Sequence, residues 1–179
     1  SGTCFADIGN QVYCVDKDEK KINKLNSGIS PIYEPGLDEL IKKNFKEKRL
    51  IFTTDIKKAI ASSDIIFICV GTPNKKGSLK VDLSFVYKCI KEVFLLSKNK
   101  KIIVTKSTVP VGTGDEIEKI IKKKKKLFSV ISNPEFLREG EAIRDFRYPD
   151  RIIIGSNNEN EFKLMKQLYS PLINKGAKF

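Results

Sequence analysis

Hydrophobic positions in this chain gather in short runs that alternate with longer segments mixing apolar and charged residues. Short runs of Ile, Val, Phe and Cys are typical of buried strands, because a strand covered on both faces shows no polar alternation. Such runs occur at residues 12–15, 51–52, 65–70, 102–105, 128–131 and 151–155. We therefore expect strands at these six places.

The segments between the runs have helical spacing. Helices are expected at residues 19–25, 37–45, 55–61, 82–96, 115–122 and 159–168, with Asp55 and Asp82 as N-caps. Residues 1–9 look like the back of an earlier helix. Strands that alternate with helices through short connections indicate a parallel sheet. The predicted fold is therefore α/β, a Rossmann-like, doubly wound, mostly parallel sheet with helices on both faces.

Polar turns that carry glycine or proline follow three of the predicted strands. They are Gly71-Thr72-Pro73, Lys106-Ser107-Thr108 and Ser132-Asn133-Pro134-Glu135-Phe136-Leu137-Arg138-Glu139-Gly140. Ligands of open α/β sheets bind at the carboxyl ends of the strands, and a glycine there lets the backbone approach a ligand closely. These turns thus predict a site, although ordinary turns, with Ser107 or Thr113 capping the next helix, are the alternative interpretation.

The last of these turns carries two carboxylates, Glu135 and Glu139, spaced one helical turn apart, with Arg138 beside them. The chain has no histidine, so acid–base chemistry falls to Glu, Asp, Lys or Cys. A carboxylate beside a neutral substrate can orient water and accept its proton. Glu139 is equally consistent with an acid at a helix start. The sequence leaves open whether Arg138 binds a ligand phosphate or pairs with a neighbouring carboxylate.

Asp16 ends the second strand expected of a dinucleotide-binding unit. A carboxylate at that position accepts both ribose hydroxyls and repels a 2′-phosphate, which favours NAD over NADP. The alternative role is an N-cap for the helix that follows. Lys21 lies five residues on and is either a second residue of the cofactor site or a solvated helix lysine.

Six motifs in order along the chain resemble the nucleotide-sugar dehydrogenase family. They are Val15-Asp16, Pro31-Ile32-Tyr33-Glu34-Pro35-Gly36-Leu37, Val70-Gly71-Thr72-Pro73, Lys106-Ser107-Thr108-Val109-Pro110-Val111-Gly112, Asn133-Pro134-Glu135-Phe136-Leu137-Arg138-Glu139-Gly140 and Pro149-Asp150-Arg151. The resemblance implies oxidation of the C6 alcohol of UDP-glucose to the acid, UDP-glucuronate, by two hydride transfers to NAD. Members of the family that act on GDP-mannose or UDP-N-acetylmannosamine are the alternatives.

The resemblance also assigns roles to individual residues. Glu135 is the acid–base residue, and Thr108 positions the reactive centre or its water. The residues assigned to the cofactor are Asp16, Lys21, Val70, Gly71, Thr72, Pro73, Ser107, Thr108 and Glu139. Those assigned to the sugar are Glu135, Phe136, Leu137, Arg138 and Glu139. Residues 31–37 also match the family, but their chemistry suggests nothing beyond a rigid surface loop.

The family pattern extends beyond both ends of the sequence given. Its first strand, its glycine loop, a central helix and a second, UDP-sugar-binding domain with the nucleophilic cysteine have no counterpart here. We therefore expect residues 1–179 to form one incomplete NAD-binding domain that is inactive alone. The full-length protein is expected to be a homodimer or a higher homo-oligomer.

Composition narrows the remaining possibilities. The net charge of +12 suggests a nucleic-acid-binding module as a rival, but the lysines are spread over most helices, with one block at residues 122–126. Four cysteines without a CxxC pair read as reduced, structural thiols, with Cys14 and Cys69 inside strands. No metal site is expected. The absence of an apolar run of membrane-spanning length favours a cytoplasmic protein without nucleic-acid or membrane partners.

Overall fold

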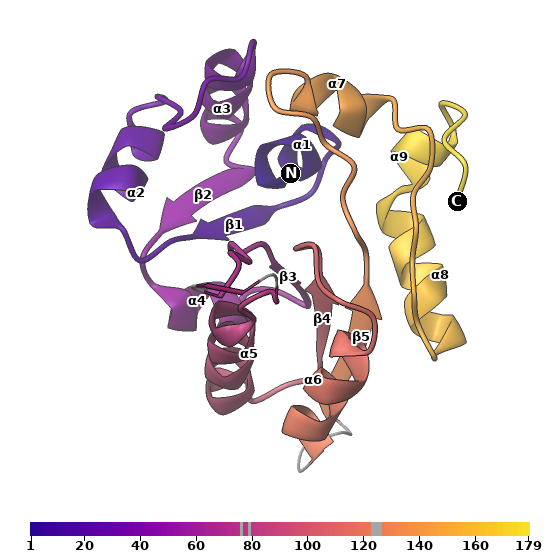
Figure 1. Cartoon of the computed structure of the whole chain (residues 1–179). Coiled ribbons are helices and arrows are strands. Elements are labelled where there is room, and N and C mark those ends of the chain that lie inside the picture. The colour runs from indigo at the N-terminus through magenta and orange to yellow at the C-terminus, as the bar shows by residue number, and fades with distance from the viewer. Residues whose placement is uncertain (76, 79, 123–126) are drawn as a thin grey trace. The chain divides into compact units, whose positions relative to one another are not determined.

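The computed structural model describes the whole chain except residues 76, 79 and 123–126 (Figure 1). It divides into two compact units. The first unit comprises residues 1–59, 136–151 and 170–178, and the second comprises residues 60–135, 152–169 and 179. Most of the lysine block at residues 122–126 lies outside the described residues.

The first unit contains two parallel strands and several short helices. Its elements are α1 (Gly2–Asp7), β1 (Val12–Val15), α2 (Glu19–Asn26), α3 (Leu37–Lys46), β2 (Leu50–Thr53), α7 (Ala142–Arg147) and α9 (Ser170–Ile173), and α4 (Ile56–Ala61) crosses its boundary. β1 and β2 are paired from Val12 opposite Leu50 to Val15 opposite Thr53.

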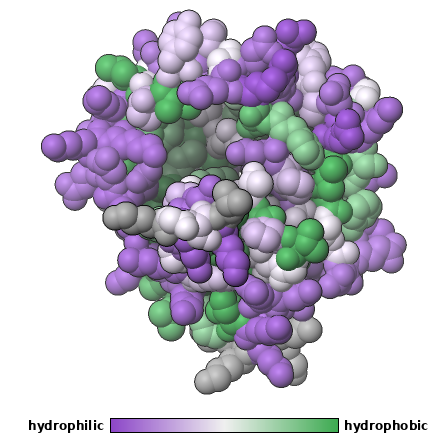
Figure 2. Space-filling view, viewed as in Figure 1, coloured by the Kyte–Doolittle hydropathy of each residue, from purple (hydrophilic) through white to green (hydrophobic). Residues whose placement is uncertain are grey.

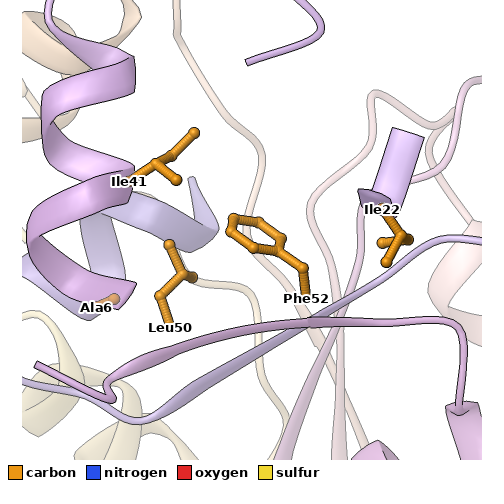
Figure 3. Packing of buried hydrophobic residues seen from close by; sticks show 5 residues of the cluster. All are labelled: Ala6, Ile22, Ile41, Leu50 and Phe52. Atoms are coloured by element: carbon orange, nitrogen blue, oxygen red, sulfur yellow. The ribbon is translucent and has the colours of Figure 1, made fainter. Parts of the chain in front are cut away.

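Helices α1, α2 and α3 pack their apolar sides on this pair of strands. The core that results consists of Ala6, Ile22, Ile41, Leu50 and Phe52 (Figure 3). Full burial of each larger side chain contributes about 1.5–3 kcal/mol. This cluster explains why short helices that would be marginal alone are stable here.

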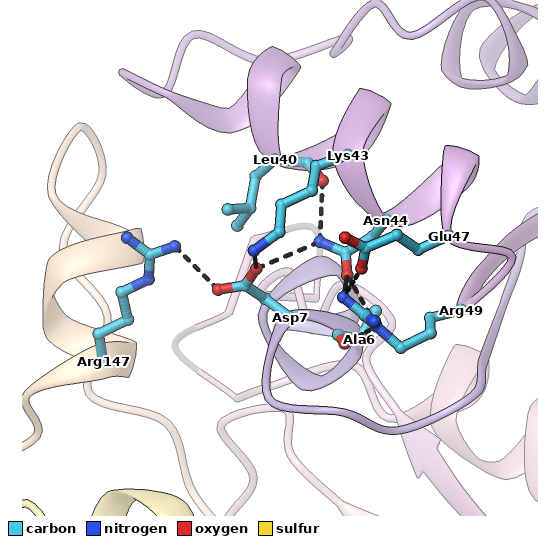
Figure 4. Close-up of polar contacts among 8 residues, drawn as sticks. All are labelled: Ala6, Asp7, Leu40, Lys43, Asn44, Glu47, Arg49 and Arg147. Carbon is cyan, nitrogen blue, oxygen red and sulfur yellow. Dashed lines mark hydrogen bonds and ion pairs between the residues drawn. The ribbon is translucent and has the colours of Figure 1, made fainter.

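Asp7 at the end of α1 ties three helices of the first unit together (Figure 4). Its carboxylate accepts hydrogen bonds from Lys43 Nζ at 2.9 Å and from an Arg147 terminal nitrogen at 2.8 Å. Asn44 is fully buried, and its Nδ2 donates to the Leu40 carbonyl at 2.9 Å. Burial raises the pKa of Asp7, but the hydrogen bonds from Lys43, Arg147 and Asn44 outweigh it and lower the pKa below its ordinary value.

We expect Asp7→Asn to destabilise the protein by about 1–2 kcal/mol at pH 7, because the ion pairs are lost while both half-exposed cations can be rehydrated. A lowered carboxyl pKa adds stability that is present above the unfolded value of about 4 and is lost as the pH falls through the folded value. The effect should therefore shrink below about pH 4. Urea unfolding at several pH values checks this. Asp64→Asn, at an exposed aspartate, is the control and should cost little at any pH.

The second unit is built on a parallel sheet of three strands in the order β3-β4-β5. Its elements are β3 (Ile65–Ile68), α5 (Ser84–Leu96), β4 (Lys101–Thr105), α6 (Thr113–Ile121), β5 (Phe128–Ser132) and α8 (Glu159–Leu168). All five residues of the central strand β4 are buried. Helices α5 and α6 pack on each other. Helix α5 also packs on β3, and α6 packs on β5. Lys101, buried at the start of β4, donates from Nζ to the Ser63 carbonyl at 2.6 Å.

The parallel α/β architecture is the predicted one, but the strands form two sheets rather than one among the described residues. The doubly wound order is 3-2-1-4-5-6. The order β2-β1 matches its 3-2 part, and the order β3-β4-β5 matches its 4-5-6 part.

Several predicted boundaries were wrong. The strand expected at 151–155 is reduced to isolated bridges, because Gly155 pairs with Ser132 while Arg151 pairs with Lys178. β3 ends at Ile68, so Cys69 lies beyond the strand and is exposed. The expected helix at 115–122 begins earlier, at Thr113.

Two predicted N-caps had different outcomes. Asp55 accepts the Lys58 N–H at 2.9 Å, which confirms it as a cap. Asp82 instead lies one residue before the cap position of α5, which is Leu83, and accepts the Ser84 N–H at 2.9 Å. The short helices α7 and α9 were not predicted, because neither is long enough to show a helical period.

Candidate active site

The carboxyl ends of β3, β4 and β5 lie at one edge of the sheet in the second unit, because the strands are parallel and in register. Ile68, Thr105 and Ser132 occupy matching positions. The turns that follow them contain residues 70–73, 106–108 and 133–135. The sequence predicted this common edge, and the roles of the residues at it stay predictions.

Hydrogen bonds fasten the turn after β3 to the turn after β4. Thr72 Oγ1 donates to the Thr108 carbonyl at 3.1 Å, and Ser107 Oγ donates to the Val70 carbonyl at 2.7 Å. Thr108 is exposed, whereas Ser107 is half-buried. Ser107 thus uses its proton within the protein and retains only lone pairs for a ligand.

Gly71 faces open space in the same edge. A Cβ built on it would meet no atom within 4 Å, and its φ lies outside the left-handed region. The fold therefore does not require glycine here. A ligand that approaches the backbone closely would require it.

We expect Gly71→Ala to leave the thermal unfolding midpoint unchanged or slightly raised, because the residue fits the backbone and reduces the freedom of the unfolded chain. The same methyl should crowd a bound cofactor and weaken NADH binding about tenfold. Fluorescence titration with NADH and thermal unfolding check both parts in the gene product that contains this chain. Gly112→Ala is the matched control, since Gly112 has a φ of +87° and alanine there should cost about 1–2 kcal/mol.

Helix α6 begins without a side-chain cap. Its N-cap is Gly112, so capping by Ser107 or Thr113 is wrong as an alternative role for these residues. Thr113 Oγ1 instead donates back to the Pro110 carbonyl at 2.7 Å. This hydrogen bond closes a turn in the connection from β4 to α6.

Asn133 anchors the turn after β5, and sequence analysis did not single it out. It is 2% exposed, and its Nδ2 donates to the Ile153 carbonyl at 3.0 Å. Its Oδ1 accepts from the Tyr169 hydroxyl at 2.5 Å, and its N–H donates to the Thr105 carbonyl at 2.9 Å. The sequence showed one sign of a role for Asn133, a side-chain amide directly after a buried strand. The hydrogen-bond partners of Asn133 lie far away in the sequence, so no local pattern reveals them.

Lys106 is a second residue that sequence analysis left without a role. It is 5% exposed although it carries an ammonium group. Burial lowers the pKa of Lys106, and the nearby Glu135 and Cys69 oppose that shift. The edge therefore holds the buried amino group of Lys106 near the exposed carboxylate of Glu135.

Glu135 and Glu139 do not share a helix. Residues 133–138 have no regular structure and residues 139–141 form a turn, so the expected spacing of one helical turn does not occur. Glu139 also precedes α7, whose N-cap is Glu141, and is not an acid of the first helical turn.

Asp16 directly follows β1 in the first unit and forms an ion pair with Lys21. Its Oδ1 accepts the Asp18 N–H at 3.1 Å. The Lys21 hydrogen bond is the main reason that the pKa of Asp16 lies below its ordinary value. The N-cap of α2 is Asp18, which accepts from Lys20 N at 2.9 Å, so Asp16 is not the helix cap. Asp16 and Lys21, both assigned to the cofactor by the resemblance, are thus in contact, and Asp16 is ionised.

Arg138 has carboxylate partners, one of the two kinds of partner that the sequence left open. Its Nε and a terminal nitrogen donate to Asp145 at 3.1 and 2.7 Å, and it also pairs with Glu141. The side-chain hydrogen bond from Arg138 lowers the pKa of Asp145 to about 2. Phe136 is 56% exposed in the same segment. Arg138 therefore shapes its own loop, while the aromatic side chain stays available for a ligand.

The helix lengths and the surface of α2 are relevant to membrane and nucleic-acid partners. Within the described part of the chain, no helix is long and apolar enough to cross a membrane. Figure 2 shows hydrophilic side chains gathered over α2 on the face in view. Lys20 and Lys24 of this helix are exposed.

A parallel α/β fold with an acid after β1 and polar turns at the carboxyl ends of β3, β4 and β5 defines an NAD-binding domain of the dehydrogenase type. The chain belongs to the UDP-glucose/GDP-mannose dehydrogenase family, because residues 1–173 match that family's NAD binding domain. The resemblance seen in the sequence and the fold class predicted from it are thereby confirmed.

Relatives of known name agree with this assignment. The chain is 51% identical over 176 residues to UDP-glucose 6-dehydrogenase of Rhizobium meliloti, covering 96% of the chain and 40% of that protein. It is 49% identical over 174 residues to the Bacillus subtilis enzyme of that name, covering 96% of the chain and 38% of that protein. The chain thus spans about 40% of the length of the curated relatives it matches.

Solved structures show the same fold. The UDP-glucose dehydrogenase of Pyrobaculum islandicum matches with a TM-score of 0.91 and 34% identity over 99% of this chain and 41% of that one. A ternary complex of GDP-mannose dehydrogenase from Pseudomonas aeruginosa matches with a TM-score of 0.89 and 35% identity over 94% of this chain and 41% of that one.

Proposed function

We propose that the protein containing this chain is an NAD-dependent UDP-glucose 6-dehydrogenase that converts UDP-glucose to UDP-glucuronate. The observation that carries the proposal is the edge of the second unit, where Thr72, Thr108 and Glu135 follow three parallel strands in register. The names of relatives at 51% and 49% identity favour UDP-glucose among the sugars of the family.

The chain's residues fit NAD in both units considered separately. In the first unit, the ionised Asp16 offers carboxylate oxygens to ribose hydroxyls and repels the 2′-phosphate of NADP. In the second unit, the open space at Gly71 admits a ligand close to the backbone, beside Val70, Thr72 and Pro73. When bound, NAD accepts the hydride removed from the alcohol carbon.

Glu135 is the proposed acid–base residue of this edge. Its carboxylate is exposed, so it can contact substrate or water directly. Asn133 holds the turn that presents it, and Lys106 places a positive charge near it. Glu135 would orient the water that attacks the oxidised carbon and accept its proton. The Thr108 hydroxyl would position the same water or the reacting alcohol.

Oxidation of an alcohol to an acid without release of aldehyde requires a covalent carrier, and a cysteine thiol is suited to it. We propose that the carrier is outside this chain. Among its four cysteines, Cys4 is buried and Cys14 and Cys89 are half-buried. Cys69 is exposed, but the glycine-rich motif that the resemblance leads us to expect around a nucleophilic cysteine is absent there. The 179-residue chain alone is therefore expected to form no NADH.

The test is the stoichiometry of NADH formation by the gene product that contains this chain. Two NADH per UDP-glucose, with UDP-glucuronate as product, are expected. GDP-mannose and UDP-N-acetylmannosamine should be poorer substrates by kcat/KM. Faster turnover of GDP-mannose would instead support the second candidate, which the likeness to the Pseudomonas aeruginosa GDP-mannose dehydrogenase favours. No turnover of any of the three sugars would overturn the proposal.

We further propose that both units belong to one NAD-binding domain and that the full-length protein is a homodimer or a larger homo-oligomer. We propose no nucleic-acid or membrane partner. Light scattering measures the oligomeric state of the purified full-length protein. A monomer would contradict this part of the proposal. Retention on DNA at physiological salt with a steep salt dependence would support the rival role suggested by the charge of +12.

A further inference from the structure

The Glu34 carboxylate holds a backbone segment more than a hundred residues away in the sequence. Its Oε2 accepts the Gly140 N–H at 3.0 Å, and its Oε1 accepts the Ile143 N–H at 3.1 Å. Both contacts lie within the first unit. One carboxylate thus satisfies two main-chain donors at the junction between the residue 136–140 segment and α7. Hydrogen bonds to a charged acceptor are the stronger class.

The loop that carries Glu34 is itself fixed before it meets this segment. Ser30 N donates to Asp38 Oδ1 at 2.7 Å, and Leu37 N donates to the Glu34 carbonyl at 3.1 Å. Pro35 restricts the backbone next to Glu34. The backbone that carries Glu34 is therefore already ordered, so less conformational entropy is lost when the side chain reaches its two partners. This gives residues 31–37 a role that their sequence alone did not suggest.

A second carboxylate holds the other end of the segment. Asp145 accepts the Arg138 N–H at 2.9 Å in addition to the two bonds from the guanidinium. The backbone of the segment is thus fixed at Arg138 by Asp145 and at Gly140 by Glu34. Phe136 and Glu139, which lie outside these bonds, remain exposed. A fixed backbone with free side chains is the arrangement that a binding loop needs.

We infer that Glu34 is a positioning residue for nucleotide-sugar binding, acting by fixing the backbone of residues 136–140 through Gly140 and Ile143. The inference rests on the proposed function, because that function assigns Phe136 and its neighbours to the sugar. It deepens that function by naming a residue from a distant loop. The expected consequence is a larger effect on the sugar, to which four residues of the segment are assigned, than on the cofactor, to which only Glu139 of the segment is assigned.

The experiment compares Glu34→Gln and Glu34→Ala with Glu39→Gln in the gene product that contains this chain. Gln keeps one acceptor oxygen and places an amide group where the second oxygen was, whereas Ala removes both acceptors. Glu39 is an exposed glutamate of α3 and loses the same charge. Hydrogen–deuterium exchange of peptides spanning residues 138–147 reads the backbone directly. Steady-state kinetics give KM for UDP-glucose and for NAD separately.

The expected result is exchange at Gly140 and Ile143 about tenfold faster in Glu34→Gln and faster still in Glu34→Ala. In Glu34→Gln, KM for UDP-glucose should rise about tenfold and KM for NAD, which depends on the segment only through Glu139, should rise less, while the thermal midpoint stays close to wild type. Glu39→Gln should change none of these. Equal increases in both KM values, or faster exchange without a change in KM for UDP-glucose, would show a merely structural brace and overturn the inference.

Exchange and kinetics also separate this inference from the proposed function. Unchanged exchange in Glu34→Ala would overturn the positioning role even in a protein that oxidises UDP-glucose normally. A wild-type protein that oxidises no UDP-glucose would overturn the proposed function and, with it, the assignment of the segment to that sugar. Glu34→Ala could lower the thermal midpoint by several degrees. Glu34→Gln, which keeps the side-chain shape, then decides the outcome.

Discussion

Glu135→Gln is expected to lower kcat for UDP-glucose oxidation by about 10²–10⁴-fold, the usual contribution of a general acid–base group. The amide keeps the shape and the hydrogen-bonding reach of the side chain but cannot accept a proton. Because Glu135 is exposed and its turn is held by Asn133, the variant should fold as the wild type does. The measurement is the steady-state rate of NADH formation, together with the thermal midpoint of each protein.

The control for Glu135 is Glu159→Gln in the same unit. Glu159 is an exposed carboxylate whose ion pair with Lys163, at 3.1 Å, joins residues one turn apart on α8. Such a pair contributes about 0.3–0.5 kcal/mol, so its loss should leave both rate and stability nearly unchanged. A Glu135→Gln protein that retains more than a tenth of the wild-type kcat would contradict the assigned role.

Asn133→Ala is expected to destabilise the protein by about 2–4 kcal/mol, because it removes a side chain that is 2% exposed together with both of its hydrogen bonds. The Ile153 carbonyl would lose its donor and the Tyr169 hydroxyl its acceptor. Tyr169 is 3% exposed, and burial is the main reason that its pKa is raised. Little water can replace the lost contacts there. Urea unfolding measures the loss, and kcat should fall as well because the turn that presents Glu135 is loosened.

The comparison for Asn133 is Tyr169→Phe, which removes only the hydroxyl. Tyr169→Phe should destabilise the protein by about 1–2 kcal/mol, less than Asn133→Ala. The aromatic ring still fills its place, and the hydrogen bond from Asn133 Nδ2 to the Ile153 carbonyl remains. The double variant should be less destabilised than the sum of the two, because both changes delete the same contact. Strict additivity would show that the two side chains do not interact.

Lys106 and Glu34 show why some residues of the candidate site were not recognised in the sequence. Lys106 directly follows a strand and reads there as an ordinary polar turn residue. Only the packing of β3 and β5 beside β4 buries it near Glu135 and Cys69. The importance of Glu34 likewise depends on donors at Gly140 and Ile143, which no local pattern connects to it.

The sequence by itself determined the strand and helix types, the parallel α/β class, the family and the position of the polar turns at strand ends. It could do so because periodicity, caps and turn residues act over a few neighbouring positions. The tertiary structure decided which contacts the polar side chains make. Arg138 pairs with Asp145, Asn133 accepts a hydrogen bond from Tyr169, and residues 151–155 form isolated bridges in place of the expected strand. Such contacts join residues distant in sequence, and their energy depends on burial and geometry that exist only after the chain has folded.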